Sequence, residues 1–359
     1  MGRGRRPGRL SYAGNVAESR GRLWTGVLRV APHSGDHRVA LRAAISVAVP
    51  LLVLWAVGRL DLGMYASFGA FAALYGRKDP FGDRLRMQAA AGGVLIAAML
   101  AGTGLSVLGA PALVSVFAVA ALASLVTLLA YTMQWHPPGP LFVVFAAGAT
   151  ASIPASGGSF ADVVIVGGAS ALFALVVTTV FAAASARGLP PVATHKQPLR
   201  VGMLAGEMAI TVGVAASLAG TAGLVLGSHW YWATVGAVAA VSGAHVSARL
   251  IRGLQRLAGT LVGVVVAAGI LALHLPPLAV IAVAVVLQAG AEMFIGRNYG
   301  IAMIFVTPLA LLMVELASST PAEVLLRDRA VETVIGVTAG TLIALASAAV
   351  RRRGHAPAA

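Results

Sequence analysis

The chain has 359 residues, of which 58% are hydrophobic and only 11% are charged. Soluble domains carry roughly 45–50% apolar and about 25% charged residues, so this composition excludes disorder, collagen, coiled coils and most soluble folds. A net charge of +14 would favour nucleic acid as the partner of a soluble protein. Membrane proteins concentrate Lys and Arg in cytoplasmic loops, so a bilayer protein explains this charge without nucleic acid. The absence of cysteine excludes disulfides, thiolate metal sites and cysteine nucleophiles.

Residues 1–38 are polar and rich in Gly and Arg, which predicts a disordered, basic cytoplasmic arm. We expect anionic lipid headgroups to be its partners. His33, Asp36 and His37 carry metal-capable side chains, but no fourth ligand is near them in the sequence, so we expect neither a metal nor a cofactor. The apolar segment that follows is too long to be the apolar region of a signal peptide.

Twelve apolar segments follow the arm, and a membrane-spanning helix needs about 20 such residues. They are residues 39–58, 62–75, 88–108, 112–133, 141–153, 162–186, 203–226, 230–243, 257–273, 278–295, 299–316 and 331–350. Segments 62–75, 141–153 and 230–243 are short, which indicates tilted and extended helices, broken helices or re-entrant segments. The sequence thus predicts an all-α, polytopic membrane protein with about twelve transmembrane helices.

The distribution of Lys and Arg predicts the orientation of these segments. With a cytoplasmic N-terminus and twelve alternating segments, the cytoplasmic side holds nearly all of the cations, in residues 1–38, 77–86, 187–200, 249–256, 297 and 351–353. The opposite side holds only Arg59, Arg327 and Arg329. This asymmetry predicts a multi-pass protein of the cell inner membrane with both termini in the cytoplasm.

The two halves of the chain match each other at a nearly fixed offset, which predicts an internal repeat. Arg38 aligns with Arg200, residues 65–70 with 232–237, Arg86 with Arg256, and residues 168–171 with 336–339. The predicted units are a first six-helix repeat at 39–186, a cytoplasmic link at 187–202, a second repeat at 203–350 and a cytoplasmic tail at 351–359. An even number of helices in each half makes the repeats parallel, and a transport pathway tends to lie between two such bundles.

Short segments at matched positions of two repeats also indicate a transport site. Segments 62–75 and 230–243 are such a pair, so Tyr65, Trp232 and Thr234 are candidates for the pathway. The alternative is that these helices are simply tilted. Glycines spaced four apart, at Gly259 and Gly263 and again at Gly336 and Gly340, predict close helix packing instead of ligand binding.

Charged side chains inside apolar segments are functional candidates, because inserting one costs roughly 2.5–3.5 kcal/mol. Glu207 and Glu292 both lie in the cytoplasmic half of their segments and are candidates for a proton pathway. The alternative is a structural ion pair, with Arg42 as the expected partner of Glu207. His245, at the end of the eighth segment, is a further candidate for proton relay.

Residues 292–299 form the densest polar cluster in the second half. Arg297, Asn298 and Tyr299 offer a guanidinium group, an amide and an aromatic ring to an organic anion. The alternative is an ordinary cytoplasmic turn with interfacial anchors.

The second half resembles the fusaric-acid-resistance-like (FUSC) integral membrane transporters. The resemblance rests on His229–Thr234, on the run from Leu254 to Gly263 with Gln255, Arg256, Gly259 and Thr260, on Arg297-Asn298-Tyr299, and on Phe305–Pro308. It implies a helical inner-membrane protein of two six-helix units, related to aromatic acid exporters. It also implies efflux of small organic acids, many of them aromatic.

These observations predict a proton-coupled exporter of small amphipathic or aromatic organic acids. An organic-anion channel of the same architecture and a non-transporting membrane scaffold are the alternatives, and a channel would need a wetted pore with rings of cations. We expect no enzyme, because neither an HExxH nor a GxSxG motif is present. The sequence leaves the substrate and the oligomeric state open.

Overall fold

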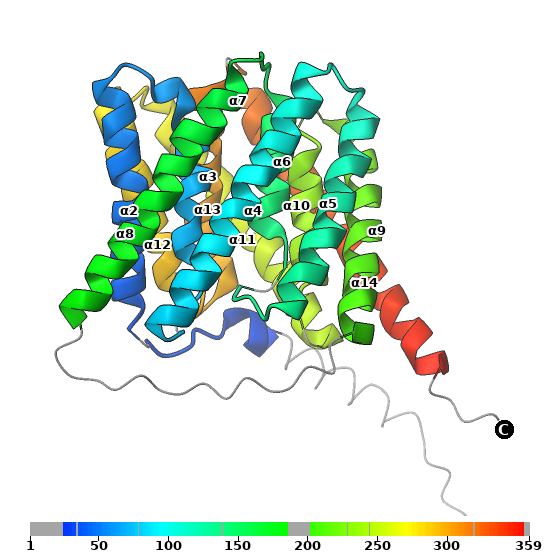
Figure 1. Ribbon diagram of the computed structural model, residues 1–359. Coiled ribbons are helices and arrows are strands. Elements are labelled where there is room, and N and C mark those ends of the chain that lie inside the picture. The colour runs from blue at the N-terminus through cyan, green and yellow to red at the C-terminus, as the bar shows by residue number, and fades with distance from the viewer. Residues whose placement is uncertain are drawn as a thin grey trace, which may run out of the picture.

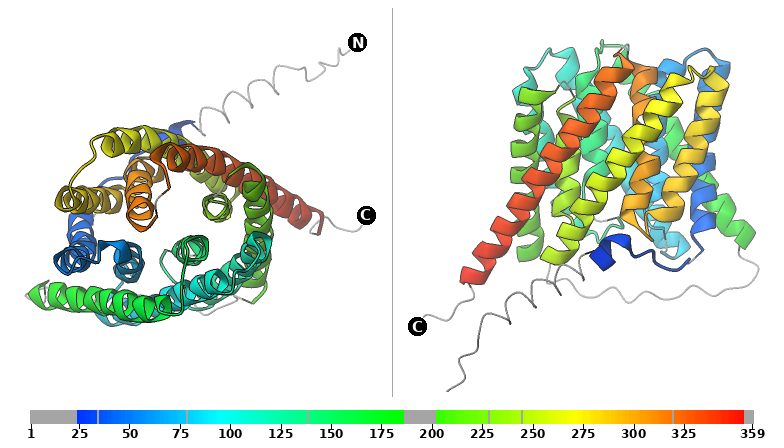
Figure 2. Two further views of the ribbon diagram at one scale, coloured as in Figure 1. Left: turned by 90° about the horizontal axis from the view of Figure 1, so that it is seen from above. Right: turned by 180° about the vertical axis from the view of Figure 1, so that it is seen from behind.

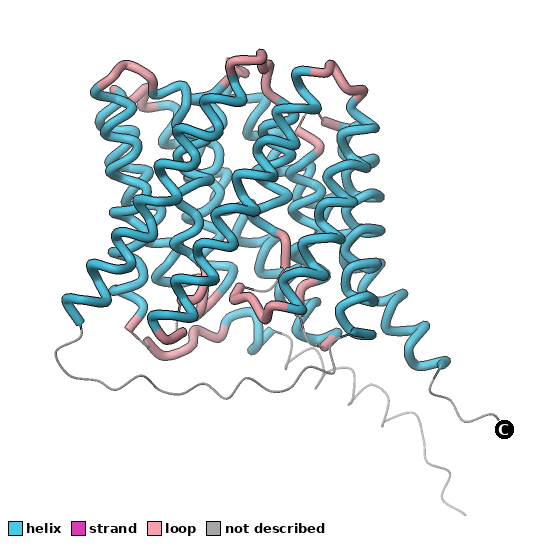
Figure 3. The backbone as a smooth tube through the Cα atoms, viewed as in Figure 1, coloured by secondary structure: helices cyan, strands magenta, loops and turns pink. Residues whose placement is uncertain are grey.

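A computed structural model of the chain describes residues 24–33, 35–77, 79–137, 139–185, 202–227, 229–243, 245–318 and 320–354. Within these ranges the regular structure is entirely helical (Figure 3). Residues 1–23 of the predicted arm, the last residue (186) of the predicted first repeat, 187–201 of the predicted link and 355–359 of the predicted tail lie outside the described residues.

The first half of the chain contains six apolar helical segments. They are α2 (Asp36–Ala56), α3 (Gly63–Ala70) between the 3₁₀ turns η1 (Leu60–Leu62) and η2 (Phe71–Leu74), α4 (Phe81–Val107), α5 (Ala112–Thr132), α6 (Leu141–Ser152), and α7 (Ser159–Asp162), which continues through the π-helical turn η3 (Val163–Gly167) into α8 (Gly168–Ser185).

The second half also contains six helices. They are α9 (Gly202–Leu226), α10 (Tyr231–Val241), α11 (Val246–Ala272), α12 (Pro277–Phe294), α13 (Tyr299–Ala317) and α14 (Ala322–Gly354).

Nine helices in the described part of the chain are long and apolar enough to cross a membrane. Three shorter apolar helices, at Leu60–Leu74, Leu141–Ser152 and Tyr231–Val241, coincide with the three short segments of the sequence. The predicted all-helical membrane fold is therefore confirmed. The predicted count of twelve spans remains a proposal, because length alone does not establish that the short helices cross.

Three helices begin well before the boundaries expected from hydropathy. The α4 helix begins at Phe81, α11 at Val246 and α14 at Ala322, whereas the sequence placed these starts at 88, 257 and 331. The added turns contain charged residues, at which the apolar criterion ended each segment. Arg329 is the clearest case, because it was expected in an outer loop and is only 2% exposed inside α14.

The helices form an outer wall around four inner helices. Seen from above in Figure 2, α3, α6, α10 and α13 lie inside a ring made by the longer helices. Every residue of α10 is buried. The outer helices expose large apolar side chains instead, such as Leu125 on α5, Val180 on α8 and Val265 on α11, as expected of a surface that faces lipid.

The ring is closed by contacts between the two halves of the chain. The α2 helix packs on α12, and α5 packs on α9. Inside the ring, α6 contacts α10, and α3 contacts α13. The first half and the second half are thus held together by two outer seams and two inner contacts.

Close helix packing depends on the glycines that the sequence singled out. A Cβ on Gly259 would collide with the backbone oxygen of Gly300 on α13, and one on Gly336 would collide with that of Ala233 on α10. The same spacing that brings α11 onto α13 thus brings α14 onto α10, as predicted for small residues four apart.

Replacing Gly336 by Ala is expected to destabilise the protein by about 1–3 kcal/mol, because the added methyl group overpacks the interface between α14 and α10. Thermal unfolding in detergent micelles measures the effect. Gly269→Ala is the matched control, since no atom lies within 4 Å of a Cβ at that position. Equal melting temperatures for the two variants would contradict this account of the packing.

Candidate functional site

A cavity lies among the inner helices and is bounded by both halves of the chain. It encloses about 1170 Å³ of empty space, its open mouths included. The first half supplies an apolar wall from α3, η2 and α6. Its main residues are Met64, Phe68, Phe71, Leu74, Leu141, Phe142 and Phe145.

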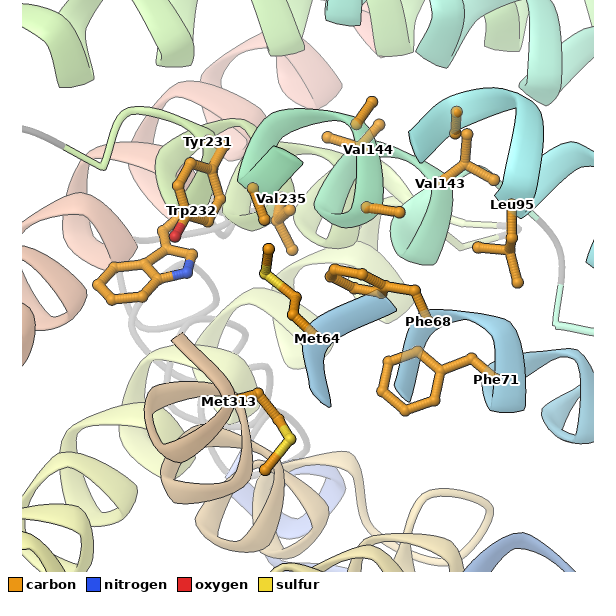
Figure 4. Packing of buried hydrophobic residues seen from close by; sticks show 14 of the residues in the cluster. Met64, Phe68, Phe71, Leu95, Val143, Val144, Tyr231, Trp232, Val235 and Met313 are labelled. Atoms are coloured by element: carbon orange, nitrogen blue, oxygen red, sulfur yellow. The ribbon is translucent and has the colours of Figure 1, made fainter. Parts of the chain in front are cut away.

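The aromatic rings of this wall pack edge-on and leave little polar surface. The ring of Phe68 lies 5.8 Å from that of Phe71 and 5.0 Å from that of Phe145, in both cases nearly perpendicular. Figure 4 shows Met64, Phe68 and Phe71 projecting from the same stretch of chain. Such a wall favours contact with an apolar or aromatic group.

The second half supplies nearly all of the polar groups of the cavity. They are Ser242, Arg252, Arg256, Gln288, Glu292, Tyr299 and Arg329, from α11 to α14 and the connection after α10. The cavity is therefore amphipathic: the first half of the chain supplies its apolar wall, and the second half supplies nearly all of its polar groups.

Arg256 and Tyr299 form the centre of the polar wall. The Nη1 of Arg256 donates a 2.7 Å hydrogen bond to the Tyr299 hydroxyl, and the guanidinium of Arg252 lies 4.2 Å from the centre of the Tyr299 ring. Arg256 is 2% exposed, and its Nε has no hydrogen-bond partner within the described residues. Tyr299 thus contacts two arginines, but its neutral hydroxyl does not neutralise them.

Arg329 is the second buried arginine of the wall. Its guanidinium carbon lies 5.2 Å from the centre of the Trp232 ring. Its Nε has no hydrogen-bond partner in the described part of the chain, and no carboxylate oxygen there lies within ion-pairing distance of its guanidinium. A buried guanidinium in this state is suited to receive an anion.

Glu292 contributes the negative charge of the cavity wall, and a cation neutralises it. The Nη1 of Arg77 lies 3.0 Å from Oε2 of Glu292, and Nη2 donates to the Glu292 backbone oxygen at 2.8 Å. Asp36 lies 3.8 Å from the same guanidinium. Since this pair is neutral, the three arginines give the cavity a positive potential.

A second group of ionisable residues lies behind Arg329. The Nδ1 of His229 lies 2.8 Å from Oδ2 of Asp328, and the backbone N–H of His229 donates to Oε1 of Glu332 at 3.0 Å. The rings of His229 and Trp232 stack at 4.9 Å. Asp328, Arg329 and Glu332 share the first turns of α14, so this cluster adjoins the cavity through Arg329 and Trp232.

The candidate carboxylates of the sequence lie in different environments. Glu292 lines the cavity, whereas Glu207 is half-buried between α9 and α14, where it accepts a 3.1 Å hydrogen bond from Ser347. The predicted pair of Arg42 with Glu207 is wrong. Arg42 donates to the Ala73 oxygen and lies in the field of Glu292, because α2 packs on α12.

The side chains of Arg297 and Asn298 donate hydrogen bonds to backbone oxygens of residues 27–31. Arg297 donates through Nε to the Ala31 oxygen at 2.9 Å, and Asn298 donates to the oxygens of Val27 and Arg29 at 3.0 Å. The Asn298 side chain also caps α13 by accepting from Ile301 N. Neither residue lines the cavity, in contrast to their neighbour Tyr299.

The segment bound in this way, residues 24–31, belongs to the predicted disordered arm. Residues 24–28 are helical, and Gln255 donates a fourth side-chain hydrogen bond to this segment, to the Val27 oxygen at 3.0 Å. We call residues 24–31 the strap. It lies along the ends of the helices on the face where α2 begins (Figure 1).

The remaining candidates lie outside the cavity wall. Tyr65 and Trp232 are buried on α3 and α10, and the Thr234 hydroxyl donates to the Trp230 oxygen of its own helix. His245 is exposed at the start of α11. Of the ten candidate residues, the structure places Glu292 and Tyr299 in the wall.

The sequence missed Arg252, Arg256 and Arg329 because these residues had been counted as loop cations. Their spacing was informative. Arg249, Arg252 and Arg256 recur at intervals of three and four, which places them along one face of a helix.

The fold and the cavity together define a multi-pass, helical membrane protein with an internal, positively charged cavity. Residues 208–343 match the model of the family described as fusaric acid resistance protein-like, and this match confirms the predicted resemblance of the second half. The matched part contains every charged residue of the cavity wall. No curated protein and no solved structure matches the chain.

Removing one charged side chain of the Arg77–Glu292 pair is expected to lower the free energy of unfolding by about 3–5 kcal/mol, because the other charge stays buried without a partner. Arg77→Met should therefore lower the melting temperature strongly, and the double variant with Glu292→Gln should recover part of the loss. Arg59→Gln breaks an exposed pair with Asp61 and should have little effect. Additive losses in the double variant would show that the pair is not coupled.

Proposed function

We propose that the protein is a transporter that exports small amphipathic organic anions, aromatic acids among them, with coupling to protons. The observation that carries this proposal is the division of the cavity into an aromatic wall and an arginine-bearing wall. A carboxylate placed against the arginines would leave an attached ring against Phe68 and Phe145. Both interactions are favourable only for a molecule that is charged at one end and apolar at the other.

The energetics support an anionic ligand. A buried charge costs roughly 2.5–3.5 kcal/mol on insertion scales. For a buried guanidinium this free-energy cost is smaller when an oxyanion accepts hydrogen bonds from it. Arg256 and Arg329 are both about 2% exposed and have no carboxylate partner within the described residues. Burying a ring against the opposite wall adds about 25 cal/mol for each Å² of apolar surface removed from water.

The architecture that we propose has twelve crossings in two parallel repeats. A glycine of α3 contacts a glycine of the sixth segment, Gly69 with Gly167, and the pair Gly236 and Gly336 repeats this contact in the second half. The α2 and α9 helices begin on the face where α8 and α14 end (Figure 1), as an even number of crossings in each half requires. The cavity then lies between the repeats, where transport pathways tend to form.

For the orientation, we propose that this face is cytoplasmic and that the membrane is the inner membrane. Supporting this, Arg59 lies on the opposite side, and Arg77, Arg84 and Arg86 lie on the proposed cytoplasmic side. Anionic lipid headgroups on that side are the proposed partners of the basic arm.

Reporter fusions test this topology. Fusions after Gly188 and after Gly354 are expected to report a cytoplasmic location, because an even number of crossings precedes each site. A fusion in the connection after α2, at Gly58, should report the opposite side. An external location for either of the first two would contradict twelve crossings.

A channel and a scaffold are the alternative functions. An anion channel needs a continuous wetted pore, whereas the wall formed by α3 and α6 is apolar and aromatic. This observation favours a binding site over a pore. The cavity with its unpaired arginines favours transport over a purely structural role.

Flux of the fluorescent aromatic acid 2-naphthoate through proteoliposomes tests the proposal. We expect saturable flux, and we expect Arg329→Met to weaken the apparent affinity at least tenfold, or by about 1.4 kcal/mol. Phe145→Ala should weaken naphthoate more than acetate, which has no ring. Arg86→Gln is the control, because its side chain is 86% exposed.

The outcomes separate the three functions. Flux that does not saturate and does not respond to a pH difference would support the channel. A rate equal to that of empty liposomes would support the scaffold and contradict transport.

A further inference from the structure

The cluster behind Arg329 contains a carboxyl group, Glu332, whose surroundings differ from those of Glu292 in the cavity wall. Glu332 is 0% exposed. Its Oε1 accepts the backbone N–H of His229, and its Oε2 has no hydrogen-bond partner in the part of the chain that the structure describes. An ionised carboxylate is costly to bury without a paired cation, whereas a protonated carboxyl is not. The site therefore suits a group that gains and loses a proton.

The protein holds this carboxyl in place from a neighbouring connection. A Cβ on Gly227 would lie 2.5 Å from Oε1 of Glu332, so the chain between α9 and α10 passes close to this carboxyl group. His229 is fixed in turn by its contact with Asp328 at 2.8 Å and by its stacking on Trp232. Glu332 is thus a positioned group and not an incidental one.

The charged and titratable groups around Glu332 and its neighbour Arg329 come from α14 itself and from α10, α11, α13 and the connection before α10. They are Asp328 and Arg329 on α14, His229 before α10, Tyr231 on α10, Arg256 on α11 and Tyr299 on α13. Arg329 is the cation among them that both lies near Glu332 and reaches the cavity. The positive charge of Arg329 therefore interacts both with Glu332 and with any anion that binds in the cavity.

We propose that Glu332 is the proton-binding carboxyl of this transporter and that its protonation strengthens the binding of a substrate carboxylate at Arg329. This inference rests on the proposed function. When Glu332 is ionised, its charge offsets that of Arg329 and opposes a second anion. When a proton from water forms an O–H bond on Glu332, Arg329 is left with an uncompensated charge, and the anion binds more tightly.

The sign of this linkage has a consequence for transport. Proton and anion binding favour each other, so the loaded cavity carries both, and both return to water on release. One proton then moves in the same direction as one anion, so the export proposed above is driven by the outward gradient of the acid and not by the entry of protons. Glu332 supplies this coupling, in contrast to Glu292, which pairs with Arg77.

Binding of 2-naphthoate to the purified protein at different pH values tests the linkage, between about pH 6 and 9, where the probe is ionised. The affinity should rise up to tenfold for each unit of falling pH. In Glu332→Gln it should stay high and independent of pH. Glu207→Gln, which alters a carboxyl outside the cavity, should keep the dependence of the unaltered protein. A Glu332→Gln variant with the full pH dependence would overturn the proposal.

Calorimetry on the unaltered protein provides a test that needs no variant. Titration with naphthoate in buffers of different ionisation enthalpy should show uptake of up to one proton for each anion bound. Naphthoate binding without proton uptake at any pH would overturn the linkage and leave the proposed function intact. An absence of naphthoate binding, or an Arg329→Met variant that binds normally, would overturn both.

Discussion

The cost of burying a charge in a low-dielectric interior governs the organisation of this protein. The outer helices meet this constraint by exposing Leu, Val and Ile, and the charged residues that enter the bundle face inward. Most of these find a partner there. Glu292 pairs with Arg77, and His229 with Asp328. Arg329 and Glu332 lie close together with no direct ion pair between them, and for this reason the proposed binding of a proton and an anion is assigned to them.

The second determinant is the close approach of helices through small residues. Inner helices such as α10 and α13 lie directly against α14 and α11 because glycines replace side chains at the points of contact. This compact interior positions short helices whose ends lie near the cavity. Larger residues at Gly259 or Gly336 would separate the helices and move the arginines of α11 and α14 relative to Phe68 and Phe145. Packing and the shape of the cavity are therefore aspects of one arrangement.

The sequence predicted the helical membrane fold, the three short helices, the packing glycines and the family of the second half. The first three follow from composition and spacing, which are local, and the family follows from the resemblance of particular motifs. It did not predict the cavity, since that depends on which helix faces meet. Hydropathy ended segments at charges, so Arg256 and Arg329 were read as loop residues although their helices continue through them. Arg297 and Asn298 were attractive as ligands because of their chemistry. Only the fold shows that the backbone of residues 27–31 already occupies their hydrogen-bonding groups.

The strap has a mechanical consequence. Its backbone oxygens at Val27, Arg29 and Ala31 bind side chains from two places, Gln255 within α11 and the turn that joins α12 to α13. The strap is thus a cross-brace between elements that carry Arg256 and Tyr299. Any rearrangement that slides α11 past α13 has to break these hydrogen bonds or carry the brace with it. The stiffness of the arginine wall is therefore set in part by a segment that never reaches the cavity.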